Sequence, residues 1–405
     1  MQTRLADFIR DTPEGREADA ILRKCVHCGF CTATCPTYQL LGDELDGPRG
    51  RIYLVKQVLE GAAPTAKTRL HLDRCLSCRS CETTCPSGVR YGRLADIGRA
   101  IIERSARRGP VETLFRRLLS AVLPRTGWFA FFLALGRTVR PLLPAGLSQK
   151  IPPAAGPAGA WPAPRHARKM LALAGCVQPA LAPSINAAAA RVLDRAGVSL
   201  IEAAGAGCCG ALRFHLNEQE AGRDDMRRLI DAWWPRIEAG EIEAIAMTAS
   251  GCGSFVREYA HHLGADPRYR EKAAKVASLA RDLCEVVPEG GIAAASSKRR
   301  VAFQSPCSLQ HGQQLRGRVE ALLAKAGFEL TPVAEPHLCC GSAGSYSILQ
   351  PELSLRLRER KLAALASGGP DVVATANIGC LSHLQAGGAL PVRHWIELLD
   401  DPGSA

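Results

Sequence analysis

The sequence predicts a mixed fold in which a mainly helical, cysteine-rich domain precedes a duplicated α/β domain. Residues 1–100 carry eight of the 17 cysteines in two compact groups, and the other nine are widely spaced after residue 165. In that later zone, apolar runs typical of strands alternate with helical segments, and the whole pattern occurs twice. A chain of 405 residues is long enough for two or three such domains.

Composition and the N-terminus place limits on the class of protein. Apolar residues make up 47% and charged residues 22% of the chain, which is ordinary for a globular protein. Charges interrupt the first ten residues, so no signal peptide is expected and the chain is predicted to be cytoplasmic. In a compartment where thiols stay reduced, clustered cysteines usually indicate metal.

Residues 1–100 contain the same cysteine run twice. Each run has the spacing C-x-x-C-x-x-C-x-x-x-C-P, which is typical of bacterial two-cluster ferredoxins. Three thiolates separated by two intervening residues each can surround one [4Fe-4S] cluster. The fourth cysteine of the run lies too far along the chain to reach that cluster and binds the other one. The predicted ligand sets are Cys25, Cys28, Cys31 and Cys85 for one cluster, and Cys75, Cys78, Cys81 and Cys35 for the other.

Zinc and disulfides are the less favoured alternatives for these cysteines, since four-Cys zinc sites normally use two separated C-x2-4-C pairs. Basic side chains around the two runs either offset the negative charge of thiolate-bound clusters or lie on a solvated surface. Both interpretations stay open for the arginines near the cysteine runs, which are Arg49, Arg51, Arg74, Arg79, Arg90 and Arg93.

The middle of the chain has no cysteine. Residues 101–150 are predicted to form a basic and apolar helical connector, and residues 151–164, rich in Pro and Ala, a linker. The stretch Trp128–Leu135 is apolar, aromatic and flanked by arginines. It predicts either a helix that lies against a membrane or partner, or a buried core helix, and both interpretations stay open.

The repeats are predicted to span residues 165–290 and 291–405. Each contains an apolar run that ends in a single cysteine, then a Cys-Cys-Gly triplet, then a second apolar run that ends in Gly-Cys. The single cysteine and the pair are 32 positions apart in both copies, because Cys176 precedes Cys208 as Cys307 precedes Cys339. Two matched units predict a gene duplication.

The repeated cysteines are candidates for further cluster ligands. Adjacent cysteines suit a compact metal site or a vicinal disulfide, and the bland alternative is a set of small buried hydrophobic residues. The candidates are Cys176, Cys208, Cys209 and Cys252 in the first copy, and Cys307, Cys339, Cys340 and Cys380 in the second.

These motifs together resemble the iron-sulfur subunits of glycolate oxidases over nearly the whole chain. The most specific stretches are Lys24–Pro36, Asp46–Ile52 and Cys75–Val89, followed by two cysteine-rich repeats of the heterodisulfide-reductase type, here called CCG repeats. The fullest repeat pattern ends in Cys-x-x-Cys, whereas here Phe255 and His383 occupy the second cysteine position. Cluster binding by five thiolates is therefore not expected.

The resemblance implies an electron-transfer subunit of a flavin-dependent complex that oxidises glycolate to glyoxylate, without catalytic residues of its own. It further implies FAD-containing partner subunits, a quinone pool or other membrane acceptor, and peripheral association with the inner membrane. The alternatives are a subunit of a related lactate or glycerol-3-phosphate dehydrogenase, or a thiol-disulfide reductase like heterodisulfide reductase. The net charge of +12 is scattered along the chain without a recognition motif, so nucleic-acid binding is not expected.

Overall fold

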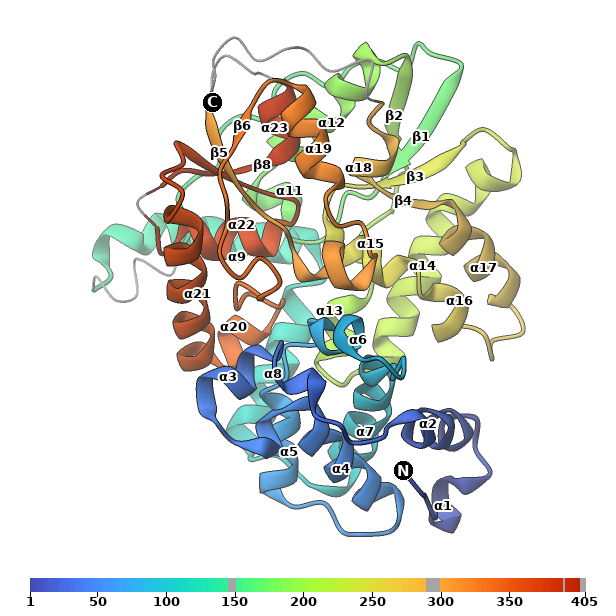
Figure 1. Ribbon diagram of the computed structural model, residues 1–405. Helices are drawn as coiled ribbons and strands as arrows, with labels where there is room; N and C mark the ends of the chain where they lie inside the picture. Colours follow the sequence, from blue (N-terminus) through green and yellow to red (C-terminus); the bar gives the residue numbers. More distant parts are fainter. Residues whose placement is uncertain (145–150, 289–298, 389, 401–405) are drawn as a thin grey trace. The chain divides into compact units, whose positions relative to one another are not determined.

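The computed structural model describes residues 1–144, 151–288, 299–388 and 390–400. The chain divides into two compact units (Figure 1). The first comprises Met1–Arg117 and His337–Leu357, and the second comprises Leu118–Pro336 and Arg358–Ala405. The predicted boundary between the repeats, at residues 290 and 291, lies outside the described residues.

The N-terminal part of the first unit is built from short helices. Proline fixes the first turn of α2, α3 and α4, where its missing N–H has no helical partner to lose. Thr12 caps α2 by accepting a hydrogen bond from the Gly15 N–H at 3.0 Å. The elements are α1 (Asp7–Arg10), α2 (Pro13–Lys24), η1 (Phe30–Thr32), α3 (Pro36–Leu41), η2 (Glu44–Asp46), α4 (Pro48–Leu59), α5 (Ala66–Asp73), α6 (Ser80–Thr84) and α7 (Tyr91–Ser105).

The core of this unit lies between α2, α4 and α7. The completely buried residues there include Leu22, Val55, Leu59 and Leu94. Cys25, Cys81 and Val89 of the cysteine runs belong to the same hydrophobic cluster. Helix α7 continues to Ser105, so the domain boundary predicted at residue 100 falls inside a helix. The same unit contains α20 (Tyr346–Leu349), which comes from the second repeat of the sequence.

The second unit contains two parallel four-stranded sheets. The first has the order β2-β1-β3-β4 and the second the order β6-β5-β7-β8, so each strand of one sheet has a counterpart in the other. This is a mixed α/β architecture with a duplicated arrangement. The strands are β1 (Arg168–Ala172), β2 (Val198–Glu202), β3 (Ala244–Met247), β4 (Ala280–Asp282), β5 (Arg300–Gln304), β6 (Glu329–Leu330), β7 (Val372–Thr375) and β8 (Val392–His394).

Helices of both repeats share one core with the two sheets. Buried residues from α12, α19 and α23 belong to the same hydrophobic cluster as strands β1 and β5 (Figure 1). The helices outside the first unit are α9 (Thr126–Val139), η3 (Arg140–Leu142), α11 (Gln178–Leu181), α12 (Ser184–Arg195), α13 (Ala211–His215), α14 (Gln219–Glu238), α15 (Ser250–Val256), α16 (Tyr259–His262), α17 (Arg270–Leu279), α18 (Leu283–Val286), η5 (Ser308–Gly312), α19 (Arg318–Lys325), α22 (Ile378–Gln385) and α23 (Trp395–Asp400). Two further helices, α8 (Pro110–Val122) and α21 (Pro351–Ala366), run from one unit into the other.

Polar contacts also join the two repeats. The Ser250 and Ser308 hydroxyls lie 2.8 Å apart, and the His394 Nε2 atom is 2.9 Å from the Thr248 carbonyl oxygen. The Ser184 hydroxyl donates to the Glu397 carboxylate at 2.6 Å. The repeats therefore stabilise each other, because neither buries its apolar helices alone. Within residues 151–164, all of which are described, there is no helix or strand.

The apolar segment at Trp128 is not a core helix. It forms α9, and no residue of α9 is buried. The buried-helix interpretation is therefore wrong for this segment, because most of its large side chains are exposed and Phe129 and Leu133 are only half-buried. No single helix among the described residues is long and apolar enough to cross a membrane, and only the bent pair Pro110–Val122 and Thr126–Leu142 reaches that length and composition.

Candidate metal centres

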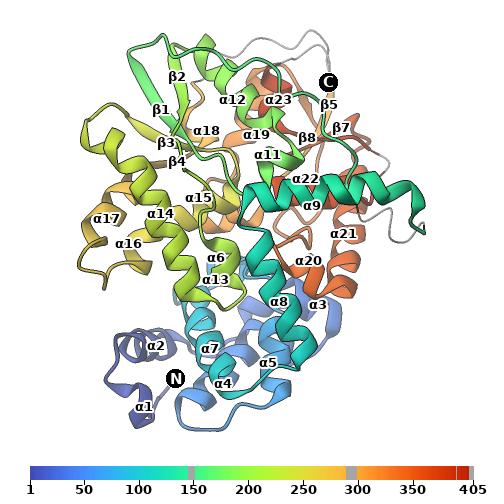
Figure 2. The same ribbon diagram turned by 180° about the vertical axis from the view of Figure 1, so that it is seen from behind.

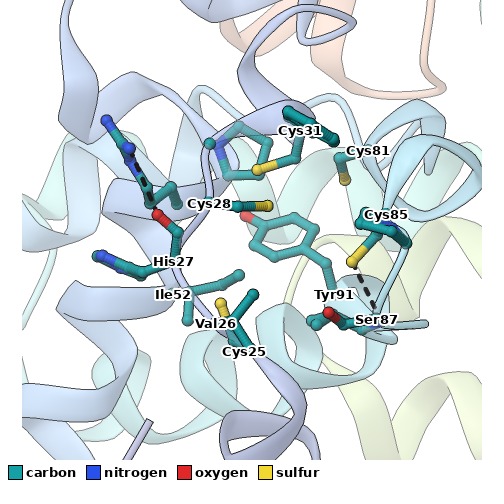
Figure 3. A pocket seen from close by; sticks show the side chains of 16 residues that line it. Cys25, Val26, His27, Cys28, Cys31, Ile52, Cys81, Cys85, Ser87 and Tyr91 are labelled. Carbon is teal, nitrogen blue, oxygen red and sulfur yellow. Dashed lines mark hydrogen bonds between the residues drawn. The ribbon is translucent and has the colours of Figure 1, made fainter.

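Four cysteines of the predicted first set surround one cavity of the first unit. Figure 3 shows the thiol groups of Cys25, Cys28, Cys31 and Cys85 distributed around a space of about 430 Å³ that is open to solvent at its mouth. Cys28 is exposed and Cys25 is buried. Cys85 reaches this cavity from the second cysteine run, 54 positions beyond Cys31 in the chain.

The second predicted set surrounds a second cavity of about 420 Å³. Its walls include Cys35, Cys75, Cys78 and Cys81, so here the first run contributes its fourth cysteine. Cys81, Pro48 and Tyr91 line both cavities, which places the two thiol sets side by side. Four convergent thiols per cavity are the donor set that a [4Fe-4S] cluster requires, so the residues present fit that group.

The loops between the cysteines adopt the same unusual backbone in both runs. His27 and Gly29 have φ angles of 61° and 88°, and the corresponding Ser77 and Arg79 have φ angles of 51° and 60°. Non-glycine residues rarely adopt positive φ, and where they do the surroundings usually enforce it at a functional site. This backbone turns main-chain N–H groups toward sulfur, as in the bond from the Ser77 N–H to the Cys75 Sγ atom at 3.4 Å.

Two buried arginines distinguish the second cavity. The Arg51 side chain is 1% exposed, lines this cavity, and donates from Nε to the His71 carbonyl oxygen at 2.7 Å. Arg99 donates to the carbonyl oxygens of Leu72 and Cys75 at 2.8 and 2.9 Å. Although burial alone raises the pKa of Cys75, the charges of Arg51 and Arg99 outweigh it and hold that pKa below its ordinary value.

The first cavity has a different electrostatic environment. Burial, followed by the neighbouring Cys25 charge, raises the pKa of Cys31 to about 11. The arginine that lines this cavity, Arg49, is 34% exposed and pairs with Glu44 at 2.6 Å. Negative charge is therefore stabilised more strongly in the second cavity than in the first.

Asp46 anchors the buried arginine. It is fully buried, and its carboxylate contacts Arg51 at 3.5 Å, Arg74 at 2.7 Å and His71 Nδ1 at 3.0 Å. Asp43, Asp46 and His71 are close enough together to hold a metal ion. Because Arg51 and Arg74 already occupy the Asp46 oxygens, we interpret this group as an ion-pair network.

In the first CCG repeat, the structure brings all four candidate thiols together. They follow the carboxyl ends of parallel strands, which meet at one edge of the sheet. Hydrogen bonds link Cys176 to Cys208, Cys208 to Cys209, and Cys209 to Cys252. The bonds from Cys176 and Cys209 lower the pKa of Cys208, and bonds to Cys208 raise the pKa values of those two thiols.

The glycine after each cysteine pair has a clear structural reason. Gly210 and Gly341 have φ angles of 89° and 91°, and each N–H donates to the first cysteine of its pair, at 3.4 and 3.5 Å. A Cβ atom would lie 2.5 Å from the Gly222 carbonyl oxygen in one copy and 2.6 Å from the Ser354 carbonyl oxygen in the other. Only glycine fits at either position.

The cysteines of the second repeat are divided between the two units. Cys339 and Cys340 are buried in the first unit, whereas Cys307 and Cys380 belong to the second unit. Within the first unit, Tyr346 donates its hydroxyl to the Arg74 carbonyl oxygen at 3.1 Å. Burial and the charges of Cys75 and Cys339 raise the pKa of this phenol.

In the two repeats, different residues occupy the position of the second cysteine of the Cys-x-x-Cys pattern. Phe255 is buried in the first repeat and packs edge-to-face on Phe214 at 5.4 Å, with the His262 ring 5.0 Å away. An apolar aromatic cluster therefore replaces a thiolate there. In the second repeat, His383 lies half-buried in α22.

Comparison with known families agrees with this division of the chain. Residues 21–89 match a family model described as a 4Fe-4S dicluster domain, and residues 170–257 and 301–385 each match the cysteine-rich domain model named CCG. Over 402 residues, 99% of this chain is 54% identical to the glycolate oxidase iron-sulfur subunit of Escherichia coli, covering 98% of that protein. The chain belongs to the glycolate oxidase iron-sulfur subunit family.

More distant similarities extend this result. A probable glycolate oxidase iron-sulfur subunit of Bacillus subtilis is 30% identical, with 90% of this chain and 89% of that protein covered. The lactate utilization protein A of an Exiguobacterium strain is 22% identical over 56% of this chain and 94% of its own length. A crystal structure of a hypothetical Helicobacter pylori protein matches the fold with a TM-score of 0.51 at 11% identity, covering 98% of this chain and 75% of that one.

Some residues of the site carry no clear signal in the sequence. Arg51 could equally have been a surface residue, and nothing in the sequence singles out Arg99 or Tyr91. Arg51 belongs to the stretch Asp46–Ile52, so the motif was visible, but its partner His71 lies 20 positions away. Sequence spacing carries no signal for such a tertiary contact.

Proposed function

We propose that this chain carries electrons in a complex whose FAD-containing partner subunits oxidise glycolate to glyoxylate, and that it delivers them toward a quinone pool or another membrane acceptor. The observation that carries the proposal is the pair of adjoining thiol-lined cavities, in a chain so similar to an iron-sulfur subunit along its whole length. We further propose that the complex works at the cytoplasmic face of the inner membrane.

The proposal assigns each cluster its ligands. Cys25, Cys28, Cys31 and Cys85 hold one [4Fe-4S] cluster, and Cys75, Cys78, Cys81 and Cys35 hold the other. When bound, such clusters accept and release single electrons. The shared wall of Pro48, Cys81 and Tyr91 keeps the two sites adjacent, and the positive-φ loops position the thiolates before iron arrives.

The substrate chemistry belongs to the partner. Oxidation of a hydroxy acid removes two electrons together with protons, and a flavin accepts such a pair and releases the electrons singly. In this chain the thiols of both cavities are committed as ligands, so neither centre offers an open coordination position to glycolate.

The CCG repeats are candidates for a further cluster. In the first repeat the linked thiols of Cys176, Cys208, Cys209 and Cys252 form a four-sulfur donor set. For the second repeat, Cys307, Cys339, Cys340 and Cys380 stay predicted ligands. An iron content clearly above eight per chain, four per cubane, would support a third centre, and its loss in Cys208→Ser would assign that centre to the first repeat.

The test is anaerobic co-expression of this chain with the flavoprotein subunits, followed by dye reduction with glycolate, lactate or glycerol 3-phosphate. We expect activity with glycolate, and only when the flavoprotein subunits are present. A preference for lactate or glycerol 3-phosphate would assign the chain to a related dehydrogenase. Disulfide reduction by the single chain would instead favour a thiol-disulfide reductase.

A further inference from the structure

Helix α9 and the following turn η3 expose one continuous apolar face. Large side chains recur along it at helical spacing, and we call this set the α9 face. Its members are Trp128, Phe131, Phe132, Leu135, Val139 and Leu142. Their exposed fractions reach 56% for Trp128, 59% for Phe131 and 85% for Leu142. The aromatic rings pack mainly on one another, with Trp128 stacked on Phe132 at 5.9 Å.

The opposite side of α9 contacts the rest of the second unit. Thr126 donates to the Gly175 carbonyl oxygen at 3.4 Å, and Arg137 donates to the carbonyl oxygens of Pro152 and Pro153 at 3.2 and 2.7 Å. Figure 2 shows α9 lying across the surface of this unit beside α11. A surface helix of a globular protein normally turns its apolar stripe inward, whereas α9 has half-buried Phe129 and Leu133 on one side and a second, exposed apolar stripe on the other.

The charge of the surrounding sequence is one-sided. From residue 113 to residue 193 the chain has no Asp or Glu, whereas Arg125, Arg137 and Arg140 flank the α9 face. Arg125 donates to the Ala121 carbonyl oxygen and Arg137 to the two proline carbonyl oxygens, and neither pairs with a carboxylate among the residues that the structure describes. The surface is therefore complementary to an extended negative charge.

We propose that the α9 face lies in the interface of an anionic lipid bilayer. Exposed Trp, Phe and Leu on one side and arginines along the flanks are the composition of interfacial helices, and anionic headgroups attract such arginines. A helix of 14 residues is shorter than the roughly 20 residues needed to span a bilayer, so it lies in the plane of the membrane. This inference rests on the proposed delivery of electrons to a membrane acceptor and names the surface that makes the contact.

The test is flotation of the full chain, with its clusters reconstituted anaerobically, on two kinds of vesicle. One kind is pure phosphatidylcholine, and the other contains equal parts of phosphatidylcholine and phosphatidylglycerol. The double variant Trp128→Ser/Phe131→Ser removes two large side chains of the face. Phe8→Ser is the matched control, because Phe8 is 56% exposed, as Trp128 is, but belongs to α1.

We expect the wild-type chain and Phe8→Ser to bind the anionic vesicles at least tenfold more tightly than the neutral ones. The double variant should lose at least tenfold of that binding while its iron content and circular dichroism stay unchanged. Equal binding of the double variant and wild type would overturn the inference. Failure of the wild-type chain to bind either kind of vesicle would also overturn it. Loss of the flavoprotein partners by the double variant would overturn it as well, because it would show that the α9 face is a protein interface.

A second readout separates this inference from the proposed function. In the assembled complex, the double variant should reduce a water-soluble dye at the wild-type rate but lose reduction of quinone in anionic vesicles. If the wild-type complex floats with the vesicles yet never reduces quinone, the proposed acceptor is wrong and the α9 inference stands. If quinone reduction survives in the double variant, the proposed function stands and the inference fails.

Discussion

Replacing Arg51 by methionine should lower the reduction potential of one cluster selectively. Arg51 lines the cavity of Cys35, Cys75, Cys78 and Cys81, and its side chain is 1% exposed. Reduction adds a negative charge to a cluster, and a buried cation nearby stabilises that charge. Removing the guanidinium therefore makes reduction harder at this cluster, while the cluster of the other cavity should change less.

The size of the shift follows from the electrostatics of a buried charge. Two unit charges about 8 Å apart interact by about 2 kcal/mol at an effective dielectric constant of about 20. A tenfold change in equilibrium is about 1.4 kcal/mol and about 59 mV for one electron, so we expect a decrease on the order of 90 mV. The variant also breaks a buried ion pair, which should lower the free energy of unfolding by about 3 kcal/mol. This value is at the low end of the usual range because Asp46 keeps Arg74 and His71 as partners.

The assay is a redox titration of the reconstituted full chain followed by electron paramagnetic resonance. Arg51→Lys keeps the charge and should stay close to the wild-type potential. Arg49→Met, in the first cavity, removes a half-buried arginine that is already paired with Glu44, so its shift should be smaller. An unchanged potential in Arg51→Met with full iron content, or equal shifts of both clusters, would show that the Arg51 charge does not tune the second cluster.

Three further predictions concern the ligands, the cysteine-pair loop and a buried carboxyl. Cys35→Ser should perturb the cluster of the second cavity and Cys85→Ser that of the first, and electron paramagnetic resonance spectra with the reverse pattern would show that each run closes on itself. Gly210→Ala should lower the free energy of unfolding in denaturant titrations by about 1–3 kcal/mol, because a Cβ atom has no room there. Gly207 has open space around it, so Gly207→Ala should change that free energy little. Equal effects of the two substitutions would show that the crowding at Gly210 does not matter. Burial raises the pKa of Asp282 to about 6, more than hydrogen bonds from the Cys284 N–H and Gln313 lower it. Its folded pKa therefore exceeds its unfolded one, so the wild-type chain loses stability as the pH rises from about 4, the ordinary Asp value, to about 6. The stability of Asp282→Asn relative to wild type should consequently increase, by up to about 3 kcal/mol, between pH 4 and pH 7.5 in thermal or urea unfolding, and a pH-independent difference would contradict this assignment.

The cysteine pattern was the most informative part of the sequence. Ligand spacing is local, so the two ferredoxin-type runs and the two CCG copies were visible without any structure. The spacing also predicted which cysteine crosses to the other set, and the structure places Cys85 and Cys35 at the opposite cavities. The reason is geometric, because the fourth cysteine lies beyond the reach of its own loop.

Tertiary arrangement accounts for what the sequence did not reveal. The apolar and aromatic run at Trp128–Leu135 was visible in the sequence, but composition cannot show whether its side chains point toward the core or toward solvent. The burial of Arg51 depends on Asp46 and on the carbonyl oxygen of His71, which only the fold brings to it. Similarly, Cys339 belongs to the first unit and Cys307 to the second, although both come from one sequence repeat.

We propose that this chain conducts electrons and that the flavoprotein partner oxidises the substrate. These roles can be separated by stopped-flow bleaching of the partner flavin with glycolate, in complexes that carry Cys28→Ser or Cys78→Ser and that assemble as wild type does. We predict that flavin reduction by glycolate stays close to the wild-type rate while electron transfer to quinone is abolished. Slowed flavin reduction in either variant, or glycolate oxidation by the purified single chain, would show that this chain takes part in substrate oxidation.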